Sequence, residues 1–421
     1  MRNVHLYAAL VVIACAERGT ADNWPQFRGP NRDAVSRETG LLRSWPEGGP
    51  KVLWTTTVAQ GYAAPAIVDG RVYFNDYDQA DERWLVRCLS LKSGEEIWRF
   101  GYKRQIRANH GITRSVPAVD GKYVFSLDPK CVLHCLDASS GSEIWARNLV
   151  ADYKTVIPPW YNGQCPLLES DRVIIAPGGT ALVAALEKGT GKPIWETPNP
   201  DGLAMSHASL VPTEIDGVKQ YLYTTLAGPV GVAADDGRVL WSFPWKFNVA
   251  VPTSPLPVGD GRIFYTSCYE AETLMIRVRR EGNEFRAEKV FSLSADDWNS
   301  ETHTPILFDN HLFAVGKKSR GLFTCLDPNG RQVWTSEGKA TFDLGSYILA
   351  DGMFFVLEGK TGVLRLLEAN TKEYRELAWA QVLSGPEVWA PLALSDGRLI
   401  VRDMHEMKCL QVGQQRAGEG P

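Results

Sequence analysis

The sequence lacks several features by which enzymes and metal proteins are recognised. Its eight cysteines include no adjacent pair and no Cys-x-x-Cys, so neither a haem attachment site nor a closely spaced zinc site is indicated. No Gly-x-Ser-x-Gly is present, which removes the nucleophile motif of the α/β-hydrolases. The 45 basic residues do not outnumber the 49 acidic ones, and a formal net charge of −4 argues against nucleic acid as a partner.

Tryptophan, by contrast, is abundant. The chain of 421 residues has an ordinary globular balance, with 44% hydrophobic and 22% charged residues, and it carries 14 Trp. Its length fits two or three domains or one large repetitive domain. So many Trp in one chain indicate a structural role that is repeated many times, which predicts internal repeats.

The N-terminus has the pattern of an export signal. Arg2 precedes an apolar stretch, Val4–Ile13, which is too short to span a bilayer as a helix, and no later stretch is long enough. The sequence Val12-Ile13-Ala14-Cys15 resembles the lipobox of bacterial lipoproteins, in which the cysteine is acylated. Ordinary cleavage after Ala16 or Ala21 would instead release a soluble protein. We expect residues 1–21 to be a signal peptide and the product to be periplasmic, anchored to the outer membrane through Cys15, or secreted.

The remaining cysteines do not form an evident disulfide framework. Seven follow Cys15, an odd number for a fully disulfide-bonded exported protein. Four of them precede Leu at one repeat position and therefore look like small buried hydrophobic residues: Cys88, Cys135, Cys325 and Cys409. Cys131 and Cys135 would lie about 13 Å apart on a strand, which is beyond disulfide reach.

An Asp-Gly turn followed by a basic residue and a β-branched or aromatic run recurs along the chain. Such a turn is typical of a tight hairpin, because both central residues need a positive φ. The eight copies begin at residues 69, 120, 170, 216, 260, 309, 351 and 396, with a mean step of about 47 residues. Each copy therefore predicts a hairpin at the start of one repeat.

A second turn, with Gly followed by an aliphatic residue and Trp, comes about twenty residues after the first and joins a third strand to a fourth. Its aromatic residues are expected to be the structural docking residues of the repeat: Trp54, Trp98, Trp145, Trp195, Trp241 and Trp334. The fifth and seventh repeats are degenerate, and Phe291 and either Tyr374 or Trp379 are expected to stand in.

Four strands in about 47 residues predict a β-propeller blade, and eight repeats predict eight blades. The last repeat ends at Cys409–Val412 without a fourth strand, and Lys51–Trp54 matches the missing one. We therefore predict an all-β, eight-bladed propeller of four-stranded antiparallel blades, closed by the N-terminal strand pairing with the last blade. The expected organisation is an extended segment over 22–49, the propeller over 50–412 and a disordered tail over 413–421.

These repeats resemble the tryptophan-docking repeats of the pyrroloquinoline-quinone (PQQ)-like eight-bladed propellers, over nearly all of residues 50–412. The opening Trp24–Arg32, followed by Ser44-Trp45-Pro46, looks like the start of exported PQQ-like repeat proteins common in planctomycete-type bacteria. The superfamily holds quinone-dependent dehydrogenases and also non-catalytic members such as the BamB-type assembly lipoprotein. The resemblance implies the fold and leaves these functions as alternatives.

The dehydrogenases of this superfamily bind PQQ above the central channel, with calcium held by Glu, Asn and Asp, a catalytic Asp and often a disulfide between adjacent cysteines. None of those signatures can be matched in this sequence, and the repeats carry no long insertions. We therefore expect no cofactor and no metal, with PQQ and calcium as the alternative if the protein is an enzyme, a PQQ-dependent oxidoreductase.

Residues just before each innermost strand are expected to line one rim of the channel. By register with the proline at the strand start, the candidates are Tyr62, His110, Arg114, Asn162, Gln164, His207, Glu301, His303, Glu387 and Trp389. His207, Glu301 and His303 form a His/Glu cluster of the kind that acid–base or hard-metal chemistry uses. The other interpretation is that polar channel side chains only satisfy one another. Catalytic residues cannot be named.

Four more aromatic residues precede inner strands outside the docking series: Trp160, Tyr161, Trp245 and Trp298. Exposed aromatic side chains there would bind peptide or carbohydrate, whereas buried ones would pack against the neighbouring blade.

We predict an exported, non-catalytic, monomeric scaffold that binds protein partners in the cell envelope and touches the membrane only through a lipid anchor. The alternative is a quinoprotein alcohol or sugar dehydrogenase, or a small-ligand binder that uses Arg114, His207, Glu301 and His303.

Overall fold

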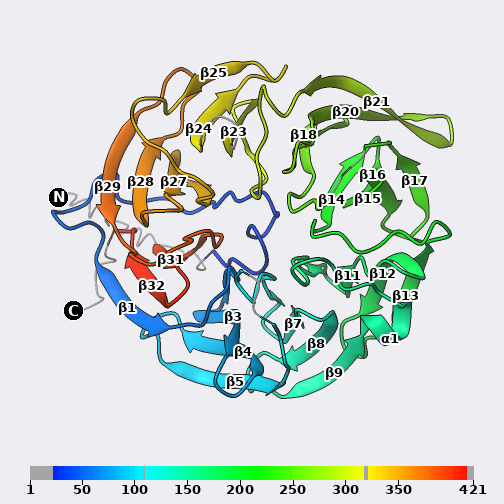
Figure 1. Cartoon of the computed structure of the whole chain (residues 1–421), viewed down its shortest axis with the longest axis horizontal. Helices are drawn as coiled ribbons and strands as arrows, with labels where there is room; N and C mark the ends of the chain where they lie inside the picture. Colours follow the sequence, from blue (N-terminus) through cyan, green and yellow to red (C-terminus); the bar gives the residue numbers. More distant parts are fainter. Residues whose placement is uncertain (1–21, 108–109, 246, 248, 317–320, 415–421) are drawn as a thin grey trace, which may run out of the picture.

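The computed structural model describes residues 22–107, 110–245, 247, 249–316 and 321–414. Eight four-stranded antiparallel sheets form a closed ring, as Figure 1 shows. The predicted fold, an eight-bladed propeller closed by the N-terminal strand, is confirmed. The expected signal peptide with Cys15, and residues 415–421 of the expected tail, lie outside the described residues.

Blades 1 to 4 follow one another along the chain, each with its strands in sequence order from the axis outward. Blade 1 contains β2 (Ala66–Val68), β3 (Arg71–Asp78), β4 (Arg83–Ser90) and β5 (Glu96–Lys103). Blade 2 contains β6 (Ala118–Val119), β7 (Tyr123–Leu127), β8 (Val132–Asp137) and β9 (Glu143–Asn148), and α1 (Leu149–Tyr153) follows it. Blade 3 contains β10 (Leu167–Leu168), β11 (Arg172–Ile175), β12 (Ala181–Glu187) and β13 (Pro193–Pro198). Blade 4 contains β14 (Val211–Ile215), β15 (Val218–Thr225), β16 (Gly228–Ala233) and β17 (Val239–Ser242).

Blades 5 to 8 complete the ring. Blade 5 contains β18 (Leu256–Gly259), β19 (Arg262–Tyr265), β20 (Thr273–Glu281) and β21 (Glu284–Leu293). Blade 6 contains β22 (Ile306–Phe308), β23 (His311–Gly316), β24 (Leu322–Leu326) and β25 (Gln332–Thr335). Blade 7 contains β26 (Tyr347–Ala350), β27 (Met353–Leu357), β28 (Val363–Glu368) and β29 (Glu376–Gln381). Blade 8 contains β30 (Ala393–Ser395), β31 (Arg398–Arg402) and β32 (Glu406–Gln411), and its outer strand is β1 (Val52–Thr57).

The ring closes where β1 pairs antiparallel with β32, with Trp54 opposite Cys409. This pairing joins chain segments about 350 residues apart. It supplies the outer strand of blade 8, so that β32 is paired along both of its edges. Within the described residues, no helix has the length and apolar character needed to cross a bilayer.

The predicted Asp-Gly turns form as expected in most blades. Both central residues have positive φ at six of the eight turns, for example 50° and 71° at Asp69 and Gly70. Blades 2 and 3 differ, because Val119 pairs with Val124 and Leu168 with Val173, which leaves four residues in each connection. The turn type therefore changes there while the hairpin is retained.

The Gly and Trp of the second signature pack against each other across neighbouring blades. A Cβ atom on Gly94 (φ 72°) would lie 2.7 Å from the Trp54 ring, so only glycine fits there, and three later blades repeat this contact. The indole N–H of the docked Trp donates to a backbone oxygen of the next blade at 2.8–3.1 Å: Trp54 to Leu91, Trp98 to Ala138, Trp145 to Lys188 and Trp195 to Ala234. At these four junctions one blade is fixed to the next by burial and one hydrogen bond, whereas Trp241 bonds to Gln220 of its own blade at 2.6 Å.

Two blades lack the docking Trp, as the degenerate repeats indicated. Phe291 stands in for it in blade 5, where it packs against Gly330. In blade 7 the prediction of Tyr374 or Trp379 is wrong, because the position opposite Leu366 is Ala378. Trp379 is the next residue along the edge strand, so its side chain points to the other face and is 61% exposed. Tyr374 contacts Trp334 of the preceding blade.

Backbone and side-chain groups just before the inner strands link neighbouring blades around the axis. Val116 N donates to Cys165 Sγ at 3.2 Å, and Cys165 N donates to Ser209 Oγ at 2.9 Å. Ser209 N continues to Ser254 Oγ at 3.3 Å, and Ser254 N to Thr304 Oγ1 at 2.8 Å. We call this level of the channel the waist. It explains why a small side chain with an acceptor atom recurs at this position from blade 3 to blade 6.

Candidate functional site

The two ends of the central channel are built from different parts of the chain. The segments before the inner strands form one end, which we call the loop mouth. The Asp-Gly turns after the inner strands form the other, which we call the turn mouth. The candidate rim residues lie before the inner strands and therefore belong to the loop mouth.

The N-terminal segment, residues 22–49, fills the turn mouth and runs into the centre of the ring (Figure 1). Trp24 and Ile67 of β2 exchange two backbone hydrogen bonds of 2.8 Å, and Pro25 O accepts one from Val119 of β6. Ala34 and Ser36 bond in the same way to Leu349 of β26. We call residues 23–36 the plug, since they add backbone hydrogen bonds to the inner strands of three blades.

Two buried arginines hold the plug in the channel. Arg28 donates to Thr304 O at 2.7 Å and Pro305 O at 2.9 Å in blade 6, and its other bonds reach the plug backbone. Arg32 donates to Pro166 O at 2.8 Å and Cys165 O at 3.2 Å in blade 3. Burial lowers the pKa of Arg28 and lowers that of Arg32 to about 10, with the neighbouring Arg28 charge contributing to the second shift. The plug is thus tied to opposite sides of the ring.

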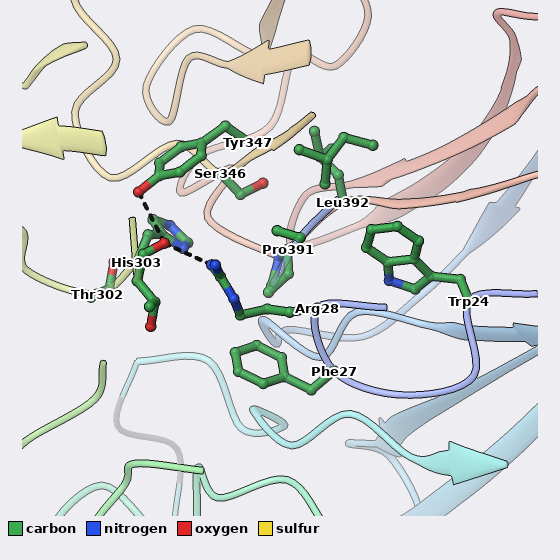
Figure 2. Close-up of a pocket in the computed structure, with 12 residues that line it drawn as sticks. Trp24, Phe27, Arg28, Thr302, His303, Ser346, Tyr347, Pro391 and Leu392 are labelled. Carbon is green, nitrogen blue, oxygen red and sulfur yellow. Dashed lines mark hydrogen bonds between the residues drawn. The ribbon is translucent and has the colours of Figure 1, made fainter. Parts of the chain in front are cut away.

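The plug also fills the waist with apolar side chains. Phe27 packs against Ala64, Val116 and Cys165, which lie just before three inner strands. A hollow remains beside the plug, and Figure 2 shows Arg28, His303 and Tyr347 facing it. It has room for about one water molecule. The channel is therefore closed by the chain itself from the turn mouth to the waist.

On the loop mouth, side chains from blades 1, 2 and 8 contact one another. The Tyr62 hydroxyl donates to Glu387 Oε2 at 2.5 Å, and the Tyr62 ring stacks on Trp389 with ring centroids 5.3 Å apart. The Arg114 guanidinium lies over the Tyr62 ring, 5.8 Å from its centroid. Burial and the Glu387 hydrogen bond raise the pKa of Tyr62. Trp389 Nε1 reaches Asp343 Oδ2 of blade 7 at 3.3 Å.

The same arc continues through blades 3 to 5. Arg114 Nη1 donates to Trp160 O, and the Trp160 ring lies 6.4 Å from His207 and 6.3 Å from Tyr269, nearly parallel to the latter. His207 Nε2 bonds to Pro159 O at 2.8 Å, and burial lowers the pKa of this histidine. Contacts between side chains therefore follow the loop mouth from blade 7 through blades 8 and 1 to blade 5.

Several bulky residues of the loop mouth have left-handed backbone conformations. Trp160, Tyr161 and Tyr269 have φ values of 60°, 70° and 54°, and Glu387 has 53°. Such conformations cost about 1–3 kcal/mol each in a non-glycine residue and cluster at functional sites. Tyr269 is also 43% exposed. The loop mouth thus holds aromatic side chains at the surface at a cost in stability.

The remaining candidate rim residues do not join this arc. Asn162 and Gln164 are buried, and Gln164 uses its amide group to bond both backbone groups of Ala176 at 2.8–3.2 Å. His110 is exposed. His303 Nε2 bonds to Leu344 O at 2.8 Å, and burial lowers the pKa of His303 to about 4. His207 therefore bonds to a backbone oxygen of blade 3, and His303 bonds to one of blade 7. Glu301 lies two residues before His303 in the same loop.

Among residues 22–107, 110–245, 247, 249–316 and 321–414, no three His, Cys, Asp or Glu residues lie close enough to hold a metal ion. The seven cysteines in this part of the chain are all buried thiols. We therefore derive no step through calcium or a quinone.

Sequence reasoning did not find the plug, Tyr269 or Asp343. The plug has no periodicity, and its partners lie as far as 313 residues away, as for Ser36 and Leu349, so a local pattern could not place it. The buried arginines within Trp24–Arg32 were the available signal, since two Arg beside Trp and Phe are unusual for a free linker.

Of the four aromatic residues that precede inner strands, Trp245 and Trp298 are buried within the blades, whereas Trp160 and Tyr161 are partly exposed at the loop mouth.

Comparison with known proteins places the fold among both classes that the repeats suggested. The quinohemoprotein alcohol dehydrogenase from Comamonas testosteroni superimposes with a TM-score of 0.65 at 14% identity, over 95% of this chain and 82% of that one. BamB from Moraxella catarrhalis gives 0.59 at 13% identity, over 87% and 99%. The computationally designed Ika8 protein gives 0.57 at 11% identity, over 86% and 100%. At such identities these likenesses show the fold alone.

A search of curated protein sequences finds no match. The family model described as outer membrane protein assembly factor BamB matches residues 81–328, which is more than half of the chain. The matched region runs from blade 1 into blade 6. The chain therefore belongs to the family of the outer membrane protein assembly factor BamB.

Proposed function

We propose that this protein is an exported, non-catalytic scaffold that binds a protein partner in the cell envelope through its loop mouth. The observation that carries the proposal is the contrast between the channel ends. The plug closes one with buried arginines that bond to backbone oxygens, while the other holds the stacked rings of Trp160 and Tyr269, with Tyr269 43% exposed. Partly exposed aromatic residues are the side chains that most often dominate protein interfaces.

Membership of the BamB family supports a role in outer-membrane protein assembly. Affinity capture from envelope extracts tests it with the mature chain as bait. We expect a defined protein to be retained by the wild type and lost from a Trp160→Ala, Tyr269→Ala double variant. Trp379→Ala is the matched control, because this Trp is exposed on blade 7 away from the loop mouth. Equal retention by the double variant, or no protein above background, would contradict the proposal.

Export with a lipid anchor is part of the same proposal, since it explains how the scaffold reaches the envelope. Cys15→Ala is expected to move the protein from the membrane fraction to the soluble fraction on cell fractionation. An unchanged distribution would mean that Cys15 carries no lipid. Ordinary signal cleavage would then be the route of export.

The second candidate is a quinoprotein dehydrogenase or small-ligand binder, favoured by the fold shared with the Comamonas testosteroni enzyme. Calorimetric titration of the mature protein with PQQ, with and without calcium, separates the two. The scaffold proposal predicts no heat of binding. Binding at micromolar concentration or tighter, abolished by His207→Ala with Glu301→Ala at unchanged melting temperature, would establish the second candidate instead.

A further inference from the structure

A chain of hydrogen-bonded polar side chains joins the outer strands of blade 1 to those of blade 2. Glu143 Oε2 contacts His134 Nδ1 at 2.7 Å, and His134 Nε2 contacts the Tyr102 hydroxyl at 3.1 Å. That hydroxyl lies 2.6 Å from Asp128 Oδ2, which also accepts from Arg104 Nε at 2.7 Å. The His134 and Asp128 side chains are 5% and 0% exposed, whereas Glu143 is 39% exposed.

The direction of the Tyr102 hydrogen bond follows from its neighbours. Asp128 accepts from Arg104 and from the Val132 amide at 2.7 Å, so it is held as a carboxylate and acts only as an acceptor. Tyr102 must therefore donate its proton to Asp128. The Tyr102 oxygen already accepts from Arg104 Nη2 at 3.1 Å, and it can accept one more bond from His134.

Counting protons shows that this chain is one short when His134 is neutral. The three contacts Glu143–His134, His134–Tyr102 and Tyr102–Asp128 each need a proton between their heavy atoms. Tyr102 supplies one and a neutral imidazole supplies one. With Glu143 ionised, all three contacts form only when His134 takes a second proton from solvent and becomes an imidazolium.

Other blades carry a permanent charge at the position of His134. His134 precedes Cys135, which pairs with the docking Trp145, and the same register holds Arg87 in blade 1 and Arg365 in blade 7. Arg87 bonds to Asp76 at 2.9 Å and Glu96 at 2.8 Å, and Arg365 bonds likewise to Glu358 and Glu376. In these two blades a cation lies between two carboxylates, whereas blades 3 to 6 hold neutral residues at this position: Ala184, Val230, Leu274 and Thr324. In blade 2 the cation depends on pH.

The groups packed around His134 oppose one another. Burial lowers the pKa of His134, and Arg104 acts in the same direction, while Glu143 and Asp128 raise it. Trp84 of β4 stacks on the imidazole with ring centroids 5.1 Å apart, which favours a cationic ring. The net lowering leaves His134 neutral at neutral pH, so one contact must open there. Glu143 is the most exposed member of the chain and can turn to water.

We propose that His134 is a proton-controlled clasp within blade 2 that closes on Glu143 when the ring gains its second proton in mildly acidic solution. Closing joins β9 to β8 and completes the hydrogen-bonded chain that ends at Tyr102 of blade 1. At neutral pH the Glu143 end opens while the Tyr102–Asp128–Arg104 part stays intact. The clasp does not depend on the proposed partner binding.

The test is histidine NMR on the full mature chain with labelled histidines, with the His134 signal identified by its loss in His134→Gln. We expect the pKa of His134 to lie below the ordinary value of about 6.5, and Glu143→Gln to lower it further by about half a unit or more. Glu96→Gln, the matched change beside Arg87, is expected to leave it unchanged. An unshifted His134 in Glu143→Gln, or a ring that stays neutral down to pH 4, would overturn the proposal.

A second readout separates a clasp from simple packing. The coupling between residues 134 and 143, from a double-mutant cycle with His134→Gln and Glu143→Gln, is expected to at least double between pH 7.5 and pH 5. In a protein that already carries His134→Arg, the effect of Glu143→Gln on the free energy of unfolding should be equal at pH 7.5 and pH 5. A coupling that does not change with pH in the wild type would also overturn the proposal.

Discussion

The loop mouth and the turn mouth are ends of one channel, and they differ in how their polar groups are used. At the turn mouth, Arg28 and Arg32 place buried guanidiniums against backbone oxygens of blades 6 and 3. At the loop mouth, the partly exposed Arg114 side chain lies over the Tyr62 ring and donates to the backbone oxygen of Trp160. The first arrangement resembles a protein interior, and the second resembles an interface without its partner.

Bulky residues with positive φ occur at both ends: Arg28 and Arg32 in the plug, and Trp160 and Tyr269 at the loop mouth. The difference lies in exposure, because both arginines are buried whereas Tyr269 is 43% exposed. An exposed aromatic side chain on a strained backbone is expected where a site is kept ready for binding. In the proposed function, the turn mouth therefore serves the fold and the loop mouth binds the partner.

Breaking the plug should have the largest effect. Arg28→Ala removes the guanidinium that four backbone oxygens share and leaves Thr304 O and Pro305 O buried without this donor. We expect the free energy of unfolding to fall by about 3–5 kcal/mol, measured by urea denaturation. Arg37→Ala, at an exposed position of the same segment, should change it by less than about 0.5 kcal/mol. Equal effects of the two variants would mean that the plug does not hold the ring.

Acid should weaken the fold where the plug meets the loop mouth. The pKa of His303 is lowered to about 4 by burial and by the Arg28 charge. Because the folded-state pKa lies below the unfolded value near 6.5, the folded state favours the neutral ring. The contribution of His303 is complete above about pH 6.5 and is lost as pH falls toward 4.

Relative to His303→Gln, the wild type should lose roughly 2–3 kcal/mol of unfolding free energy between pH 7 and pH 4. Urea denaturation at both pH values measures the difference. Parallel pH profiles for the two proteins would show that His303 is not the titrating group.

Removing one hydrogen bond at the loop mouth should have a smaller effect. Tyr62→Phe keeps the stack on Trp389 but loses the bond to Glu387, so we expect a loss of about 1–2 kcal/mol by thermal or urea unfolding. Glu387→Gln retains an acceptor and should cost less. A larger loss in Glu387→Gln than in Tyr62→Phe would place the importance of Glu387 outside this bond.

Tyr269→Gly should change stability least, although it removes an aromatic side chain. It loses the contact with Trp160 but relieves a left-handed backbone conformation, so the two effects nearly cancel. We expect the free energy of unfolding to stay within about 1 kcal/mol of the wild type by urea denaturation. A loss of 3 kcal/mol would show that Tyr269 is a structural residue and would weaken the contrast between the mouths.

The sequence predicts those parts of the fold that repeat within one blade. The Asp-Gly turns, the docking Trp residues and the missing outer strand of blade 8 all follow from contacts that recur every 47 residues or so. In blade 7 a register difference of one residue puts Ala378 at the docking position, and pattern matching alone chose its aromatic neighbours. A period of two in strands makes such a difference reverse the face of a side chain.

The candidate site was predictable only in its position along the chain. The register of the inner strands indicates that Tyr62, Arg114 and Glu387 belong to one rim. It does not show that Tyr62 pairs with Glu387 across the ring seam. The plug and the His134 chain depend on contacts between residues far apart in the sequence or on proton counts. Composition and spacing carry neither kind of information.

Site-specific photo-crosslinking in cells tests the central contrast most directly. A photoreactive residue replaces Tyr269 at the loop mouth in one variant and Asp396, in an Asp-Gly turn of the turn mouth, in another. The account predicts that the Tyr269 position crosslinks to one defined envelope protein and the Asp396 position does not. Crosslinks to the same protein from both positions, or from the Asp396 position alone, would contradict it.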